Sequence, residues 1–130
     1  MNEREKTEKA IIEYGEKYCD CKGEPAFENS VILRRKDNKK WLGIILDVKY
    51  DRLIPGREGY ARILNLKNDP VAIGSLCLEN GIYPGYHMNK ANWITVDLEG
   101  EVPLDMIFNL MEDSRLATAS KRKRKLYSAY

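Results

Sequence analysis

The sequence has no long hydrophobic run and no apolar segment at its start. These features argue against a membrane-spanning protein and against a secreted one. No stretch approaches the roughly 20 apolar residues that a membrane-spanning helix needs. Residues 1–10 (MNEREKTEKA) are mostly polar or charged and lack the apolar core of a signal peptide. We therefore expect a cytoplasmic protein that does not engage a membrane.

Cysteine and histidine are also scarce, with three cysteines and one histidine among 130 residues. An odd number of cysteines in a chain without a secretion signal argues against a disulfide framework. Cys19 and Cys21 form one close pair and Cys77 lies far away, whereas a structural zinc site commonly uses two close pairs. We expect buried or unreactive thiols, no bound metal and no cofactor.

The charge is distributed unevenly along the chain, although the composition (43% apolar, 32% charged) is that of a folded globular domain. Residues 115–130 carry six basic side chains and no acid. The other 114 residues, with sixteen basic and twenty acidic side chains, carry −4. We predict a single domain over residues 1–117 followed by a basic tail over 118–130. A basic footprint for nucleic acid would be expected on the folded surface, which the acidic body does not favour.

Hydrophobic periodicity and turn residues predict an α+β fold. Asp69 can cap a helix whose first position is Pro70, and Pro103 can open another. Gly15 weakens the first helix by about 1 kcal/mol relative to alanine. Alternating apolar residues in "WITVDL" predict a half-buried strand. The expected helices cover residues 3–20, 70–79 and the segment from 103. The expected strands cover 31–35, 41–48, 61–67 and about 92–98, with a long loop over 49–60. Short turns join the first three strands, so we expect an antiparallel sheet with helices packed on one face.

Several motifs in this order resemble the MmcQ/YjbR family of small bacterial proteins. They are "KKWLGI", "LNLKNDP" and "YPGYHMNKANWITVDLEGEVPLDMIFNLMEDS". The resemblance spans roughly residues 10–117. It departs at Ser114-Arg115, where the family has Ser-Tyr, and in the tail. The resemblance implies a fold like that of CyaY, the bacterial frataxin, and a proposed DNA-binding role without catalysis.

The segment Tyr83–Val96 holds the candidate site. Trp93 alternates with Ile94, so an exposed indole beside Tyr86 and Lys90 would make a platform for base stacking and phosphate contact. His87 could act as a base or ligand, but no motif such as G-x-S-x-G or H-E-x-x-H accompanies it, and we predict no catalytic residue. The candidate nucleic-acid-binding residues are Lys67, Tyr86, His87, Lys90, Trp93, Lys121, Arg122, Lys123, Arg124 and Lys125.

Each of these residues also has a purely structural interpretation. His87 can be a turn histidine bonded to backbone, and the last helix or the tail can cover Trp93; we favour the structural role for both. Lys67 and Lys90 can be ordinary surface charges, and the tail can serve only solubility.

The sequence therefore predicts a non-enzymatic DNA-binding protein. The alternative is a domain that binds a protein or a small ligand in a groove lined by the same motif. An iron-binding role like that of frataxin is disfavoured, because the acids of residues 3–20 alternate with Arg4, Lys6, Lys9 and Lys17.

Overall fold

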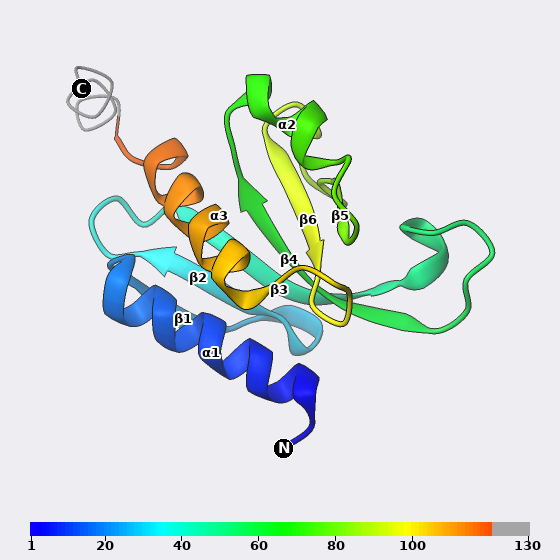
Figure 1. Cartoon of the computed structure of the whole chain (residues 1–130). Helices are drawn as coiled ribbons and strands as arrows, with labels where there is room; N and C mark the ends of the chain where they lie inside the picture. The colour runs from blue at the N-terminus through cyan, green and yellow to red at the C-terminus, as the bar shows by residue number, and fades with distance from the viewer. Residues whose placement is uncertain (121–130) are drawn as a thin grey trace.

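The computed structural model describes residues 1–120, which form three helices and six strands (Figure 1). The helices are α1 (Glu3–Tyr18), α2 (Pro70–Leu76) and α3 (Leu104–Ala117); the strands are β1 (Cys21–Pro25), β2 (Val31–Arg35), β3 (Trp41–Lys49), β4 (Tyr60–Lys67), β5 (Ile82–Pro84) and β6 (Trp93–Asp97). Short 3₁₀ turns cover Phe27–Asn29 and Tyr50–Arg52. Within residues 1–120, no helix has the length and apolar character needed to cross a membrane.

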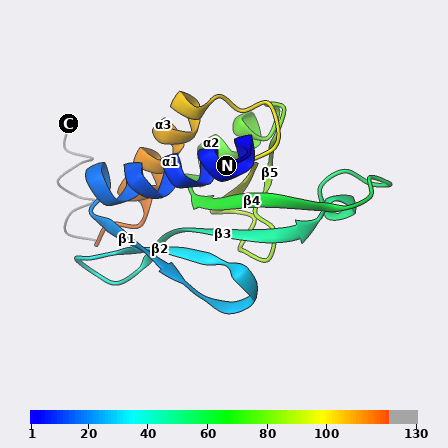
Figure 2. The ribbon, with the colours of Figure 1, turned by 90° about the horizontal axis from the view of Figure 1, so that it is seen from below.

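The strands form one antiparallel sheet in the order β1-β2-β3-β4-β6-β5. The expected α+β class and the β2-β3-β4 meander are confirmed. Helices α1 and α3 lie side by side on one face of the sheet (Figures 1 and 2). Two strands were not located from the sequence, which took Cys21–Pro25 and Tyr83-Pro84 as turns. The sequence of β1 (CKGEP) resembles a turn, and β5 is a three-residue strand that ends at Pro84. Both are edge strands, where short and irregular sequences are tolerated.

The main core lies between the sheet and the helices. Every second residue of the central strands faces α1 and α3, including Ile45, Leu64 and Ile94, which pack with Ile11 and Met111. All five side chains are fully buried. The face that meets the helices is therefore apolar along its whole central part, as expected for a sheet covered on one side by amphipathic helices.

Gly15 has a packing role in α1 that its low helix propensity hides. A Cβ atom at this position would lie 2.8 Å from the Cys21 sulfur and 3.4 Å from the Met111 methyl carbon. The glycine thus lets α1 approach β1 and α3 closely. This close packing explains why a residue that costs about 1 kcal/mol in helix propensity stands at this position.

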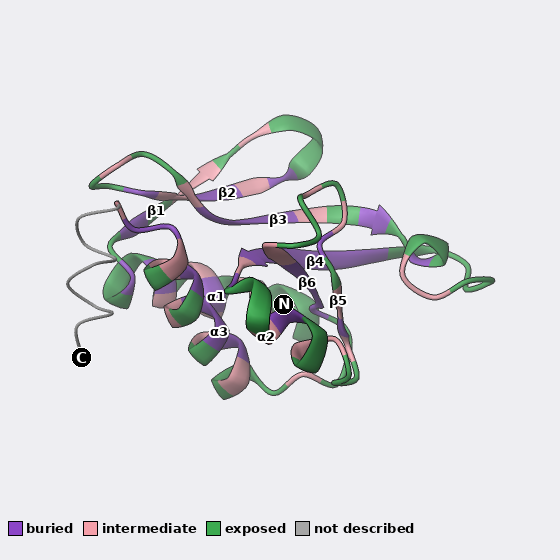
Figure 3. Cartoon of the chain, turned by 90° about the horizontal axis from the view of Figure 1, so that it is seen from above, coloured by how far each residue is buried: buried purple, intermediate pink, exposed green. Residues whose placement is uncertain are grey.

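The opposite face of the sheet carries a second, smaller apolar cluster, formed by Val48, Tyr50, Ala61 and Ile63. The loop after β3 contributes to this cluster, and the turn after β5 lies against the same face, away from the helices (Figures 2 and 3). The predicted strand is confirmed as β6, but the expectation that it is half-buried is wrong. Thr95 is fully buried and Asp97 is 3% exposed, because polar partners and loops cover their side of the sheet.

Two predicted helices are shorter than expected. The first ends at Tyr18 instead of Asp20, where Asp20 adopts a positive φ of 51°. The second ends at Leu76 instead of Glu79, because Leu78 and Glu79 donate backbone hydrogen bonds three residues back rather than four. Neither difference moves the sheet residues that form the candidate site.

Candidate nucleic-acid interface

Gly85 permits the turn between β5 and β6 to lie flat against the sheet. Its N–H donates to the Trp93 carbonyl at 2.9 Å, and a Cβ atom on it would lie 2.7 Å from the Cβ of Trp93. Any side chain at this position would therefore push the turn away from the start of β6. The glycine of "YPGY" is thus required by close backbone approach.

A buried polar network holds the Tyr86 backbone to the sheet. The Tyr86 N–H donates to Thr95 Oγ1 at 2.8 Å, and Asn65 Nδ2 donates to the Tyr86 carbonyl at 3.0 Å. The Thr95 hydroxyl in turn donates to Asn65 Oδ1 at 2.5 Å. Asn65 and Thr95 are paired across β4 and β6, so one cross-strand pair satisfies both polar groups of the turn.

His87 is exposed at the tip of this turn, with a positive φ of 62°. Its ring lies against the Tyr86 ring, with centroids 4.0 Å apart and planes tilted by 49°. Lys90 is also exposed, and its ammonium group folds back to donate to the Gly85 carbonyl at 3.2 Å. Tyr86, His87 and Lys90 therefore gather on the turn itself.

Lys67 and Trp93 are directly opposite each other, at the end of β4 and the start of β6. Alternation along the strands places both on the face of Asn65 and Thr95, which the helices do not cover. Both side chains are half-buried. Of the two expected covers of Trp93, the last helix is excluded because α3 packs on the other face, and residues 121–130 of the tail lie outside the described residues.

The second tryptophan lies on the same face. Trp41, at the start of β3, pairs with Arg34 of β2, and the next residue along β3, Leu42, bulges into the main core. Trp41 is half-buried, and neither tryptophan belongs to either apolar cluster. Arg34, Trp41, Lys67 and Trp93 thus lie on four neighbouring strands, β2, β3, β4 and β6; we call them the tryptophan row.

The tryptophan row lies at one end of the sheet that is rich in basic side chains. Here β2 and β4 end and β3 and β6 begin, and the turn from β2 to β3 exposes three lysines. We call this region the basic end; its basic residues are Lys22, Arg34, Lys36, Lys39, Lys40, Lys67 and Lys90. Of the acids at this end, Glu24 pairs with Arg34 (2.8 Å) and Asp37 with Arg35 (2.8 Å), while Asp20 and Asp69 are exposed. Many of the other acids of the acidic body lie on α1 and in the loops after β3 and β6.

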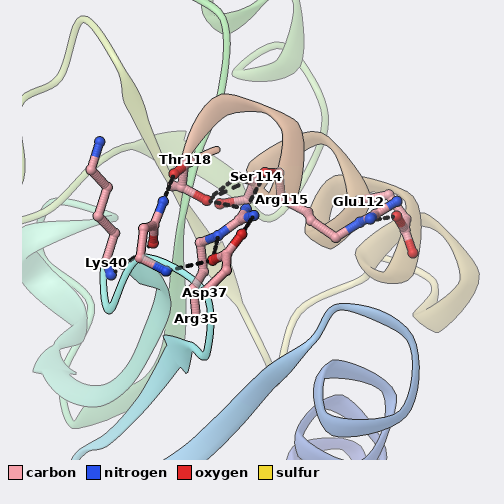
Figure 4. Close-up of polar contacts among 8 residues, drawn as sticks. Arg35, Asp37, Lys40, Glu112, Ser114, Arg115 and Thr118 are labelled. Carbon is pink, nitrogen blue, oxygen red and sulfur yellow. Dashed lines mark hydrogen bonds and ion pairs between the residues drawn. The ribbon is translucent and has the colours of Figure 1, made fainter. Parts of the chain in front are cut away.

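A buried arginine fixes the end of α3 to the basic end (Figure 4). Arg35 is 5% exposed and binds both carboxylate oxygens of Asp37 at 2.8 Å. Its other guanidinium nitrogen donates to the Arg115 carbonyl and to Thr118 Oγ1 (Figure 4). The cation thereby satisfies a carbonyl in the last turn of α3, where the helix dipole favours positive charge.

Ser114 of α3 connects the helix to two strands at the bulge. Its hydroxyl donates to the Leu42 carbonyl at 2.6 Å and accepts from the Lys67 N–H at 3.0 Å. It thus bridges β3 and β4 next to the last paired residues, Gly43 and Leu66. This contact positions both Lys67 and the strand that begins with Trp41.

The basic tail continues from this anchored end of α3. Thr118 and Ala119 are buried, and Asn38 Nδ2 donates to the Thr118 carbonyl at 2.9 Å. The described chain therefore reaches Ser120 beside the β2–β3 turn. The predicted tail residues Lys121, Arg122, Lys123, Arg124 and Lys125 lie outside the described residues.

The cysteines do not form a reactive centre. Cys19 and Cys21 are buried, and burial, followed by nearby carboxylates, raises the pKa of Cys19 to about 12 and that of Cys21 to about 11. Cys77 is half-buried, and burial raises its pKa as well. Across residues 1–120, no three His, Cys, Asp or Glu side chains come together in a way that could hold a metal ion.

Sequence reasoning missed two members of the tryptophan row, Arg34 and Trp41. Neither belongs to the motif around His87, and only the sheet order and the pairing of Arg34 with Trp41 and of Lys67 with Trp93 place all four at one end of the sheet. The available signal was the count of tryptophans: the chain has two, and both begin a strand.

Comparisons with known proteins agree with a class of small α+β domains built on one antiparallel sheet with helices on one face. A crystal structure of a Pseudomonas syringae protein, 34% identical, matches with a TM-score of 0.79 and covers 92% of this chain and 100% of that one. Protein DR2400 of Deinococcus radiodurans, a DUF419 domain, shares the fold at 21% identity, with a TM-score of 0.64 over 92% of this chain and 86% of that one.

The family is shown by a sequence relative. The uncharacterized protein YyaQ of Bacillus subtilis (strain 168) is 41% identical over 88 residues, which are 68% of this chain and 75% of YyaQ. The chain belongs to the same family as YyaQ. No family model matches the sequence.

Proposed function

We propose that the protein is a cytoplasmic nucleic-acid-binding protein of the MmcQ/YjbR type, which acts by binding DNA and not by catalysis. The observation that carries this proposal is the basic end, where lysines and an arginine surround two half-buried tryptophans on the face of the sheet opposite the helices. Cations that meet phosphates beside aromatic rings that meet bases are the usual elements of such an interface.

The uneven distribution of charge reduces the repulsion of DNA that the acidic body would otherwise cause. A DNA backbone repels a net negative surface, but it responds to the charges nearest to it, because salt screens interactions beyond about 8–10 Å. Lys36, Lys39 and Lys40 are exposed together in one turn, whereas the acids of α1 lie on the opposite side of the sheet. Binding at the basic end therefore keeps the phosphates close to cations and away from the acidic helix.

Salt-dependent binding tests the proposal. Fluorescence anisotropy of a labelled oligonucleotide, measured at several salt concentrations, gives a log–log slope of about −0.7 to −0.9 for each phosphate that the protein neutralises. We expect the K36Q/K39Q/K40Q variant to bind more weakly and to reduce this slope by about two. The matched control is K6Q/K9Q/K17Q, which removes three exposed lysines from α1. No binding by the full chain at low salt would overturn the proposal.

The tail is tested separately in the full-length protein. Changing Lys121–Lys125 to glutamine should weaken binding and reduce the slope further, because five cations follow directly after the part of the chain anchored at the basic end. Unchanged affinity and slope would remove the tail from the proposed interface and leave the basic end as the candidate.

A protein-binding domain is the second candidate, favoured by two exposed apolar side chains, one on α2 and one just after it. Val71 of α2 is 92% exposed, and Leu78, in the turn that follows the helix, is 85% exposed. Large apolar side chains that protrude together mark protein contact sites when they form a patch. If this role is the true one, L78K should abolish capture of the partner, whereas K36Q/K39Q/K40Q should not change it.

A further inference from the structure

Both tryptophans of the chain lie outside the two apolar clusters. Trp41 and Trp93 lie on the face away from α1 and α3, and neither packs into the main cluster or into the smaller one around Tyr50. A tryptophan is rarely buried completely because its ring is large, and a half-buried indole keeps part of its flat surface open to contact. Two half-buried indoles at one end of the same face therefore point to a ligand with flat surfaces.

The tryptophan row alternates in chemistry from strand to strand. Its order across the sheet is Arg34, Trp41, Lys67, Trp93, so a basic residue precedes each indole. Trp41 and Trp93 are separated by one strand, β4, and the Ser114 hydroxyl bridges β3 and β4 where their pairing ends. A nucleic acid strand that crosses the sheet would meet cations for its phosphates and aromatic surface for the bases that project from its backbone.

We propose that the tryptophan row binds single-stranded DNA and that bases stack on Trp41 and Trp93. This inference rests on the proposed nucleic-acid role. In a duplex the flat faces of the bases are occupied by neighbouring bases, so the indoles can reach them only in an unpaired strand. A single strand also carries half the charge density of a duplex and is repelled less by the acidic body. Stacking does not distinguish sequences strongly, because every base has a flat face.

Intrinsic tryptophan fluorescence reports on this site directly, because the only two tryptophans of the chain belong to the tryptophan row. Titration of the full-length protein with unlabelled (dT)12 should quench the emission. A duplex of the same length at the same salt should bind more weakly and quench less. The K36Q/K39Q/K40Q protein should show the same quenching at saturation, but reach it at higher oligonucleotide concentration.

Substitutions test the two rings separately. W41L and W93L should each weaken (dT)12 binding by about 5- to 150-fold, the range for loss of one stacked base. W41F and W93F retain a smaller ring and should lose less, with thermal melting to confirm that they fold. The matched control is Y60L, which removes an aromatic ring that is 65% exposed at the opposite end of β4 and should bind normally.

The outcomes separate this inference from the broader function. Equal affinity for duplex and single strand, with no quenching and no effect of the tryptophan variants, would overturn the inference but leave nucleic-acid binding intact. No binding to either form at low salt would overturn both. Similar binding of (rU)12 would support stacking, whereas binding of (rU)12 without (dT)12 would overturn the assignment to DNA.

Discussion

Replacing Arg35 with alanine should detach the end of α3 from the sheet. Arg35 is 5% exposed, and its guanidinium group binds both oxygens of Asp37, the Arg115 carbonyl and Thr118 Oγ1. Removing one member of a buried ion pair costs about 3–5 kcal/mol, because its partner is left uncompensated. The Asp37 side chain is 21% exposed and can recover some hydration, so we expect about 3 kcal/mol.

The neighbouring arginine provides a matched control. Arg34 faces the other side of the sheet, where its side chain is 32% exposed and paired with the 41% exposed Glu24. An ion pair of this exposure contributes at most about 1 kcal/mol, and Arg34 also donates an exposed hydrogen bond to the Lys39 carbonyl at 2.9 Å, so R34A should lose clearly less stability than R35A. Urea unfolding followed by far-UV circular dichroism measures both variants, and thermal melting should fall by roughly 10 °C for R35A.

These two variants also separate stability from binding. R34A removes a basic residue of the tryptophan row and should weaken DNA binding while leaving the fold stable. If R35A lost less than about 1 kcal/mol, like R34A, the anchoring role assigned to Arg35 would be incorrect.

Three further predictions concern buried positions. G15A should lower stability by about 1–3 kcal/mol, because a Cβ would lie 2.8 Å from the Cys21 sulfur, although alanine favours helix formation by about 1 kcal/mol. T95V should cost about 1–3 kcal/mol, because it leaves Asn65 Oδ1 and a backbone N–H of the turn without their buried partner. Cys19 and Cys21 should resist iodoacetamide at pH 8, because both folded pKa values are raised from 9.0. For the same reason their contribution to stability should be complete below pH 9 and should be lost as the pH rises through about 11 to 12.

Urea unfolding measures the first two of these variants, and mass spectrometry of alkylated protein measures the third prediction. Cys77 is the internal control, because it is half-buried and should be modified before the other two cysteines. If G15A were as stable as the wild type, the close approach of Gly15 to Cys21 would not matter for packing. If T95V were equally stable, the hydrogen bonds of Thr95 would not stabilise the turn. If all three thiols of the folded protein were alkylated at one rate, the assigned burial of Cys19 and Cys21 would be wrong.

The sequence was sufficient to predict the central elements, because they carry strong local signals. The three strands of the meander have apolar runs bounded by turns, and Asp69 and Pro70 start α2 as expected: the Asp69 carboxylate accepts the Val71 N–H at 2.9 Å. The edge strands β1 and β5 could not be predicted in this way. Their residues are ordinary turn residues, and they become strands only because partners in β2 and β6 pair with them.

The candidate site was likewise predicted only where its residues are close in sequence. The turn residues Tyr86, His87 and Lys90 are close in sequence, so a local pattern found them together. The tryptophan row depends on register between strands far apart in the chain, which no local pattern encodes. The burial of Thr95 was missed for a related reason, because alternation predicts a polar face and does not show that loops cover it.

The central claim is that nucleic acid binds at the tryptophan row, and an NMR titration tests it most directly. A ¹⁵N-labelled sample should give two indole N–H signals, one from Trp41 and one from Trp93. On addition of (dT)12 we predict that both signals shift, together with the backbone amides of Lys39 and Lys40, while the amides of α1 stay in place. Shifts confined to α1 or α2, with both indole signals unmoved at saturation, would contradict the claim.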